Sequence, residues 1–403
     1  VEKKVVSNKL INNSSIFPLE LNTMPGWAGS SWYFHRYMDP DNNEYFVGKE
    51  ALDYWQDVDL YIGGSEHATG HLLYSRFWQK FLFDLELLPV DEYAKKLINQ
   101  GMILGSSAFI YRKHGTNDYY SKNIVNNIKS EVIRVDISMV NSCDELDFEA
   151  VKKWQPQFKS ANFILENGKF IVNREVEKMS KSKYNVVSPD EICEFYGADT
   201  LRMYEMFLGP LEQSKPWSTF GISGVHSFLK KLWRLYHPNE VFSVSDVKPS
   251  NSSLKSLNQA IKKVTEDINS FSFNTCISSF MICINELTTQ KCNERIVLEP
   301  LTVLLSPFAP HISEELWFLL GNNSSLAKVA YPVFDVSYLV ESSKNYPISF
   351  NGKMRFTIKL DLALNQEEIK GFVLNNENTI QQLKGKVPKK VIIIPGKIVN
   401  IVF

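Results

Sequence analysis

The feature that most restricts the fold is a helical period of apolar residues between residues 254 and 305. In three successive stretches, apolar side chains recur at alternating spacings of three and four. This spacing places them on one face of an α-helix, which is buried against other helices. We therefore predict a helical bundle over residues 221–340. Its three apolar faces are Leu254, Leu257, Ile261, Val264, Ile268 and Phe271; Phe273, Ile277, Phe280, Ile284 and Leu287; and Ile296, Leu301, Leu304 and Leu305.

Segments of mixed α/β character flank this bundle. After it, strand-like runs at 353–358 and 391–394 enclose a helical middle, which predicts a small α/β domain over residues 341–403. Before it, a strand at Val58–Ile62 is followed by Gly63-Gly64 and a helix from Ser65 to about Phe83. The apolar run Gln100–Leu104 is a candidate for the next strand. A strand, a glycine turn and a helix place polar groups at the carboxyl end of a sheet, where open α/β folds bind ligands.

The composition excludes several classes of protein. The 403 residues carry a formal net charge of −1, so the chain is not a basic protein that wraps nucleic acid, and any RNA contact must be local. Five scattered cysteines without a CxxC pair argue against a disulfide framework and a structural zinc site. No apolar stretch is long enough to span a membrane and no signal peptide opens the chain, so we expect a cytoplasmic protein.

Two stretches are polar and rich in Asn and Ser. Residues 1–18 have the composition of a linker entering a domain. Residues 106–172 have the composition of an insertion that carries a small hairpin, with arms at 163–165 and 170–172 across Asn167-Gly168.

The insertion leads to a short cationic loop. Lys178, Lys181 and Lys183 are separated only by Met and Ser, and such a loop can close over a polyphosphate. Ser188-Pro189-Asp190-Glu191 then predicts a helix start, with Ser as the N-cap and Glu reaching back as in a capping box. A bare lysine cluster is also typical of a solvated surface turn.

A zinc hydrolase is a rival interpretation of the earlier helix. Glu66, His67 and His71 fall in its predicted first turns, with the two histidines four residues apart on one face. A zincin needs its Glu directly after the first His, whereas Glu66 precedes His67. Each histidine can also be a partly buried imidazole with no ligand role. We therefore assign no metal ligand.

The lysine loop carries a resemblance to a known family. Lys178-Met179-Ser180-Lys181-Ser182 matches the KMSKS signature of class I aminoacyl-tRNA synthetases, and Tyr196–Arg202 is similar to the segment after that signature in these enzymes. Further motifs resemble bacterial leucyl-tRNA synthetases in the same order, and only 106–172 matches poorly. These motifs are Thr23-Met24-Pro25, Ser30–Tyr33, Tyr61–Ala68, Gln100-Gly101-Met102, Pro307–His311 and Pro395-Gly396-Lys397.

The resemblance implies roles for individual residues. The lysines Lys178 and Lys181 would serve the ATP phosphates and carry catalysis. The family's substrates would be leucine, ATP with Mg²⁺, and tRNA-Leu, without structural zinc in this chain. Leucine would contact Trp27, Tyr61, His67 and His71, with Trp27 standing where the family usually has Phe. ATP would contact Gly64, Glu66, Gln100, Met179, Ser180, Lys181 and Ser182.

The resemblance also implies an architecture. Residues 19–105 would be the second half of a Rossmann-type catalytic domain, 173–220 the KMSKS loop and stem-contact region, 221–340 the anticodon-binding bundle, and 341–403 a tRNA-binding domain. The HIGH signature and the editing domain are absent, so the expected partner is an N-terminal half. The alternatives are the second subunit of a split synthetase and a non-catalytic tRNA-binding remnant. Lysines after Glu377 are candidates for tRNA phosphate contacts or simple solubility charges.

Overall fold

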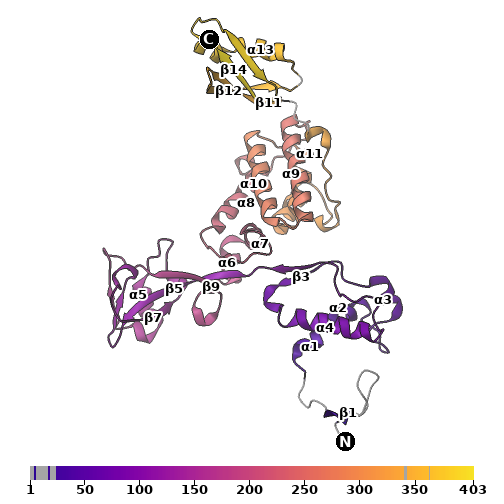
Figure 1. Ribbon diagram of the computed structural model, residues 1–403, viewed down its shortest axis with the longest axis vertical. Coiled ribbons are helices and arrows are strands. Elements are labelled where there is room, and N and C mark those ends of the chain that lie inside the picture. Colours follow the sequence, from indigo (N-terminus) through magenta and orange to yellow (C-terminus); the bar gives the residue numbers. More distant parts are fainter. Residues whose placement is uncertain (1–3, 6–16, 19–23, 340–342, 363) are drawn as a thin grey trace. The chain divides into compact units, whose positions relative to one another are not determined.

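The computed structural model describes residues 4–5, 17–18, 24–339, 343–362 and 364–403 (Figure 1). It divides into two compact units, one of residues 1–227 with 271–277 and one of residues 228–270 with 278–403. The predicted linker at 1–18 lies outside the described residues, except where β1 (Lys4–Val5) pairs antiparallel with β2 (Phe17–Pro18). None of the described helices combines the length and apolar character needed to cross a membrane.

The first unit contains a parallel strand pair joined by a helix. Strand β3 (Tyr61–Gly64) lies beside β4 (Leu97–Gln100), and α4 (His71–Asp84) connects them. This is the predicted α/β arrangement, although β3 begins later than expected and includes Gly63 and Gly64. Three short helices precede it: α1 (Gly26–Ser30), α2 (Tyr33–Met38) and α3 (Lys49–Trp55).

The predicted helix from Ser65 to Phe83 is interrupted. Ser65–His67 form a separate 3-10 turn, η1, and Gly70 breaks the helical backbone with φ −117° and ψ −101°. A Cβ at Gly70 would lie 1.4 Å from the Trp27 ring, so the indole fills the space a side chain would need. The prediction that His67 and His71 share a helical face is therefore wrong.

The predicted insertion is a folded β-rich body. Strand β5 (Ile103–Lys113) pairs antiparallel with β6 (Asp118–Tyr120), β7 (Ser130–Val135) and β9 (Asn173–Lys178), and parallel with β10 (Lys215–Pro216). Strand β8 (Asn162–Ile164) pairs parallel with β6, and α5 (Phe148–Trp154) packs nearby. The buried core is made of Ala108, Ile110, Tyr119, Val135, Val140, Leu146, Val151, Phe158, Ala161, Phe170 and Val172.

Two details of this region differ from expectation. Gly101 and Met102 separate β4 from β5, so the run Gln100–Leu104 is not one strand. The turn at Asn167-Gly168 forms, because Glu166 and Lys169 exchange backbone hydrogen bonds of 2.8 and 2.9 Å. The arms of the predicted hairpin do not pair along their length, since β8 pairs with β6 and Ile171 bridges to Glu145.

After the lysine loop the chain is helical. The 3-10 turn η5 (Lys181–Lys183) is followed by α6 (Pro189–Tyr196), α7 (Ala198–Phe207) and α8 (Ile222–Tyr236). Helix α6 starts where predicted, with Ser188 at the N-cap and Pro189 in the first turn. Ser188 makes no side-chain cap hydrogen bond, so the expected capping box is absent there.

The helical bundle contains α9 (Asn251–Asn269), α10 (Phe273–Thr289), α11 (Arg295–Leu305) and α12 (Pro310–Leu319). The predicted faces of α9 and α10 are largely buried. On α11 the prediction of Ile296 is wrong, because its side chain is 55% exposed while Val297 and Leu298 are fully buried. Counting back three and four residues from Leu301 gives Leu298 and Val297, so Ile296 lies off the buried face.

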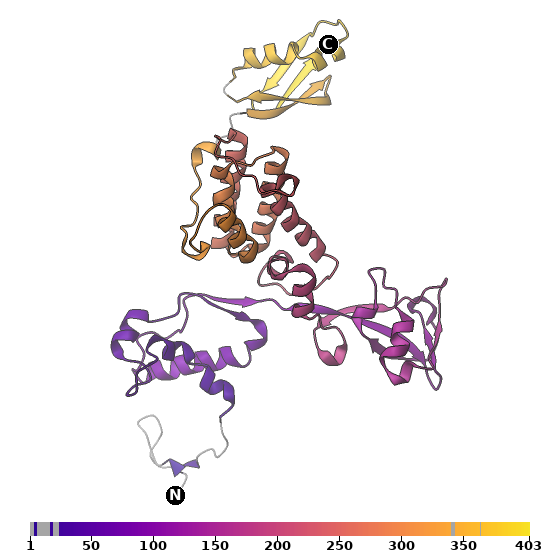
Figure 2. The same ribbon diagram turned by 180° about the vertical axis from the view of Figure 1, so that it is seen from behind.

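The last part of the chain is a small α/β sheet structure, as predicted. Strands β11 (Ser343–Phe350), β12 (Lys353–Asp361), β13 (Lys390–Ile394) and β14 (Ile398–Val402) are ordered β12-β11-β14-β13. Figure 2 shows α13 (Gln366–Leu374) and α14 (Glu377–Leu383) on one face of the sheet. Their side chains Ile369, Val373 and Leu383 join the core with strand residues such as Val399.

Candidate active site

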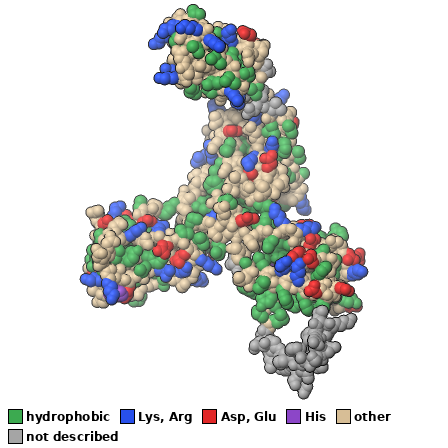
Figure 3. Space-filling view, viewed as in Figure 1, with side chains coloured by type: hydrophobic (Ala, Val, Ile, Leu, Met, Phe, Trp, Pro, Cys, Tyr) green, Lys and Arg blue, Asp and Glu red, His purple; other side chains and the backbone are tan. Residues whose placement is uncertain are grey.

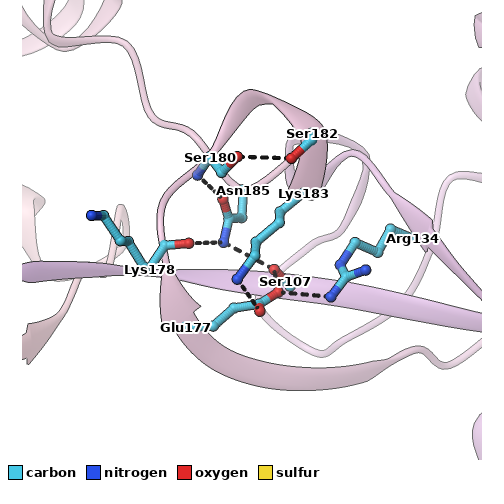
Figure 4. A network of polar contacts seen from close by, with 8 residues as sticks. All are labelled: Ser107, Arg134, Glu177, Lys178, Ser180, Ser182, Lys183 and Asn185. Atoms are coloured by element: carbon cyan, nitrogen blue, oxygen red, sulfur yellow. Dashed lines mark hydrogen bonds and ion pairs between the residues drawn. The ribbon is translucent and has the colours of Figure 1, made fainter. Parts of the chain in front are cut away.

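The lysine loop begins at the end of β9. The last residue of that strand, Lys178, pairs with Leu104 of β5. The third lysine of the loop forms an ion pair, because Lys183 Nζ lies 2.5 Å from a carboxylate oxygen of Glu177. Ser107 Oγ donates to the same carboxylate at 2.5 Å, and Arg134 lies 3.4 Å away. The hydrogen bond from Lys183, with that from Ser107, lowers the pKa of Glu177 to about 2, so the carboxylate stays charged (Figure 4).

A buried asparagine joins the two ends of the loop. Asn185 is fully buried, and its Nδ2 donates to Ser107 Oγ at 2.9 Å and to the Lys178 carbonyl at 3.3 Å. Its Oδ1 accepts from the Ser180 amide at 2.9 Å. A Cβ at Gly105 would lie 2.5 Å from the Asn185 carbonyl and 2.9 Å from Met179 Cγ, so only glycine allows this close approach.

The loop's backbone is therefore anchored while two of its lysines are exposed. Lys178 and Lys181 are both exposed, and Figure 4 shows Lys178 extending away from the Glu177 network. Ser180 and Ser182 share a hydrogen bond of 2.8 Å between their hydroxyls, and Met179 is half-buried. This arrangement presents two ammonium groups to solvent from a fixed loop, which suits binding of an anion.

A second cluster gathers the residues predicted to bind leucine. Tyr61 OH lies 2.5 Å from His71 Nε2 and 2.9 Å from Tyr33 OH. His71 Nδ1 lies 3.2 Å from Ser31 Oγ, which donates to the Trp27 carbonyl. Because the Ser31 proton is committed to that carbonyl, we assign Nδ1–H of His71 as the donor to Ser31. Tyr61 then donates to Nε2, so the imidazole is neutral.

The electrostatics agree with a neutral cluster. Burial, together with the neighbouring His67, lowers the pKa of His71, and burial raises the pKa of Tyr61. The His67 ring lies 6.3 Å from the Trp27 ring and 6.5 Å from the His71 ring, between centroids. The structure thus brings Trp27, Tyr61, His67 and His71 together as an aromatic wall, which suits an apolar side chain.

The residues predicted to contact the adenylate lie at the carboxyl ends of the parallel strands. Gly64 and Gln100 are register partners at the ends of β3 and β4. Glu66 follows in η1, and its side chain lies outside the described part of the structure. Gly101 and Met102 connect Gln100 to β5, where Leu104 pairs with Lys178. The chain therefore passes within four residues from Gln100 to the strand that pairs with the start of the lysine loop.

Several supporting residues had no predicted role. Ser107 and Asn185 are 78 positions apart in sequence, and no local sequence pattern around either residue predicts their hydrogen bond. Gly105 had a possible signal, because a lone glycine inside a strand often marks a close backbone approach. Among the described residues, no three His, Cys, Asp or Glu side chains are grouped to hold a metal ion.

Comparison with known families identifies two matching regions. The family described as anticodon-binding domain of tRNA ligase matches residues 251–370. The family described as tRNA synthetases class I (I, L, M and V) matches residues 157–216, which include the lysine loop. The first of these regions begins with helix α9, and the second includes β9 and α7.

Individual relatives match nearly all of the chain. A leucine–tRNA ligase of Christiangramia forsetii is 65% identical over 97% of this chain and 41% of its own length. One from Flavobacterium johnsoniae is 62% identical over 100% of this chain and 42% of its own length. A crystal structure of the Agrobacterium radiobacter K84 agnB2 LeuRS-tRNA-LeuAMS ternary complex matches with TM-score 0.59 and 27% identity, over 99% of this chain and 44% of that one. This chain thus spans about two fifths of its relatives' length, and leucyl-tRNA synthetase homologues cover nearly all of it.

Proposed function

We propose that this chain is the part of a leucine–tRNA ligase that carries the lysine loop, and that it acts in forming leucyl-adenylate and transferring leucine to tRNA-Leu. The observation that supports the proposal is that the three lysines of the loop differ in their contacts. Lys183 is held by Glu177, while Lys178 and Lys181 are exposed on an anchored backbone. The identity of 65% to a leucine–tRNA ligase supports the choice of reaction.

In this reaction the leucine carboxylate attacks the α-phosphorus of ATP, and pyrophosphate leaves. Negative charge grows on the leaving group, where Lys178 and Lys181 stabilise it together with the Mg²⁺ bound to the substrate ATP. Main-chain and side-chain groups of Met179, Ser180 and Ser182 line the phosphates, with Gly64, Glu66 and Gln100 at the nucleoside. Trp27, Tyr61, His67 and His71 hold the leucine side chain.

The proposal includes a partner, an N-terminal half that carries HIGH and the editing domain. One face of α4 supports it, because Leu73, Phe77 and Phe81 are 64%, 65% and 41% exposed at spacings of four. An apolar helical stripe of this kind is normally covered by another element. We place the assembled enzyme in the cytoplasm, as the family resemblance implies.

The test is leucine-dependent ATP–pyrophosphate exchange, measured with this chain alone and after adding a separately produced N-terminal half. We expect exchange only in the mixture, and weaker exchange when isoleucine replaces leucine. A hydrophobic pocket gains only about 1–3 kcal/mol of discrimination from a whole missing methylene, and isoleucine is an isomer of leucine with the same number of carbons, so some exchange with isoleucine is expected. Absence of exchange from a folded mixture would contradict the proposal.

A non-catalytic tRNA-binding role is the second candidate. Two observations favour it: the family match over 251–370, and the exposed lysines Lys384, Lys386, Lys389 and Lys390. Under this alternative the chain binds tRNA-Leu but gives no exchange with any N-terminal half, and replacing the loop lysines changes nothing. The second subunit of a split synthetase would instead show full exchange once its natural partner is added.

A further inference from the structure

The residue that follows η5 has an unusual backbone. Tyr184 has φ +54° and ψ +35°, in the left-handed region. Bulky side chains rarely adopt this conformation, and they keep it only when surrounding contacts fix it. Tyr184 also ends the lysine loop, because its amide donates to the Lys181 carbonyl at 3.3 Å. The contacts that fix Tyr184 therefore also determine how η5 turns.

These contacts come from the body formed by residues 106–172. The Tyr184 ring meets the Trp154 ring edge to face, with centroids 4.8 Å apart at 85°. Gln155 Nε2 donates to the Tyr184 hydroxyl at 3.3 Å, and the Ile137 amide donates to the Tyr184 carbonyl at 3.0 Å. One tyrosine thus bonds to this body through its ring, its hydroxyl and its backbone.

The ring contact continues into the core of that body. Trp154 stacks on Phe158, with centroids 6.0 Å apart at 9°, and Phe158 is fully buried among the core residues. An aromatic pair contributes beyond the area it buries, and here the pair joins a loop to a rigid core. Asn185, the next residue, is anchored separately on Ser107 of β5.

We propose that Tyr184 is a positioning residue through which the 106–172 body sets the conformation of the lysine loop. Displacing the body from Tyr184 removes the contacts that hold its left-handed backbone, so η5 and Lys181 rearrange. The body is in this sense a control element for the loop. The catalytic consequence rests on the proposed function, whereas the structural coupling does not.

The first test measures the loop directly in this full chain, by limited trypsin cleavage after Lys181 and Lys183. Tyr184→Asn removes the ring but keeps a residue that tolerates the left-handed region. Tyr184→Phe keeps the ring and removes only the hydroxyl. We expect cleavage about fivefold or more faster in Tyr184→Asn and less than about twofold faster in Tyr184→Phe, because cleavage follows the population of the opened loop.

Cleavage after Arg202 within α7, which belongs to the same compact unit as Tyr184, and hydrogen exchange at the Ile137 amide are the internal references. Cleavage in α7 stays unchanged if the variant is folded, while the Ile137 amide exchanges faster when its acceptor moves. Should Tyr184→Asn misfold, Trp154→Leu removes the same ring contact from the other side and is expected to expose the same loop lysines. Unchanged cleavage of the loop in folded Tyr184→Asn or Trp154→Leu would overturn the proposal.

The second test uses pyrophosphate exchange with the N-terminal half present. We expect Tyr184→Asn to raise the KM for ATP severalfold while the KM for leucine stays unchanged. Tyr184→Phe should keep the wild-type KM for ATP. A general loss of folding would not separate the two substrates in this way. If the wild-type mixture gives no exchange, the proposed function fails, while the trypsin result still decides the coupling.

Discussion

At the scale of residues, the lysine loop contains its own internal control. Lys181 is exposed, whereas Lys183, two positions later, is held by Glu177. We expect Lys181→Ala to lower the activation rate by about two to three orders of magnitude, the usual loss for one preorganised donor. Lys183→Ala should cost clearly less, because that ammonium is already neutralised. Exchange kinetics of both variants, measured with the N-terminal half present, decide this, and equal losses would contradict the assignment.

The glycine beneath the loop gives a second residue-scale prediction. At Gly105 a Cβ would meet the Asn185 carbonyl at 2.5 Å, so Gly105→Ala pushes the loop away from β5. We expect a loss of about 1–3 kcal/mol in the free energy of unfolding, as for other overpacked sites. Urea unfolding measures it, and Gly115→Ala is an unsuitable control because Gly115 has φ +72°. Gly63→Ala, with nothing within 4 Å, is the better matched variant.

A buried histidine makes stability depend on pH. Burial lowers the pKa of His35 from 6.5 to about 4, and its Nε2 lies 2.8 Å from Gln79 Oε1. The folded chain keeps His35 neutral while the unfolded chain binds a proton below pH 6.5. Stability therefore falls as pH drops from 6.5 towards 4, by about 2 kcal/mol at pH 5 relative to pH 7. Urea titrations at both pH values test this, and His35→Gln should lose that part of the dependence.

The sequence predicted site residues unevenly for a physical reason. Lysines and aromatic residues carry their chemistry in their own side chains, so a motif can nominate them as candidates. Two other features depend on pairing between β5 and β9. They are the hydrogen bond of Asn185 to Ser107 and the close approach of the Asn185 backbone to Gly105. That pairing joins distant parts of the chain and leaves no local pattern in either.

At the scale of elements, two apolar residues of α11 differ in burial, so they test whether burial sets the contribution of a side chain to stability. Ile296 is 55% exposed, whereas Leu298 is fully buried. We expect Leu298→Ala to lower the free energy of unfolding by about 2–5 kcal/mol, through lost transfer energy and a cavity. Ile296→Ala should change it by less than about 0.5 kcal/mol. Thermal or urea unfolding of the two variants measures the contrast, and similar losses would contradict the assigned face.

Elements with a strong period were predictable, and those shaped by distant contacts were not. Helices α9 and α10 follow from spacings within their own residues. The break before α4 follows instead from the Trp27 ring, which occupies the space beside Gly70. The arms around Asn167-Gly168 do not form the predicted hairpin, since β8 pairs with β6 instead.

At the scale of the whole molecule, any contact with RNA should depend on a local patch of charge, because the formal net charge of the chain is −1. Figure 3 shows Lys and Arg side chains gathered on the C-terminal sheet structure, where Lys384, Lys386, Lys389 and Lys390 are exposed. If these lysines contact phosphates, changing all four to Gln lowers the salt slope of tRNA-Leu binding by up to about four. Changing them to Arg should preserve the slope. Titrations at several salt concentrations measure it, and an unchanged slope in the Gln variant would leave them as solubility charges.

The sequence anticipated the broad order of α/β, helical and α/β parts, but treated 106–172 only as a polar insertion. Its polar residues dominate the composition, while large side chains such as Tyr119, Phe158 and Phe170, from separate segments of the stretch, form its buried core. The composition of the stretch averages over its surface and its core, so composition alone did not predict that 106–172 is a folded body.

The strand order of the C-terminal sheet has a consequence for the timing of synthesis. Strand β14 is made after β11, β12 and β13, yet it lies between β11 and β13, with Val399 and Ile401 fully buried. Until the ribosome has added residues 398–402, β13 has no neighbour in the sheet and β11 keeps an open inner edge. This part of the chain must therefore wait for its last strand before it can fold, whereas α9 and α10 can pair while translation continues.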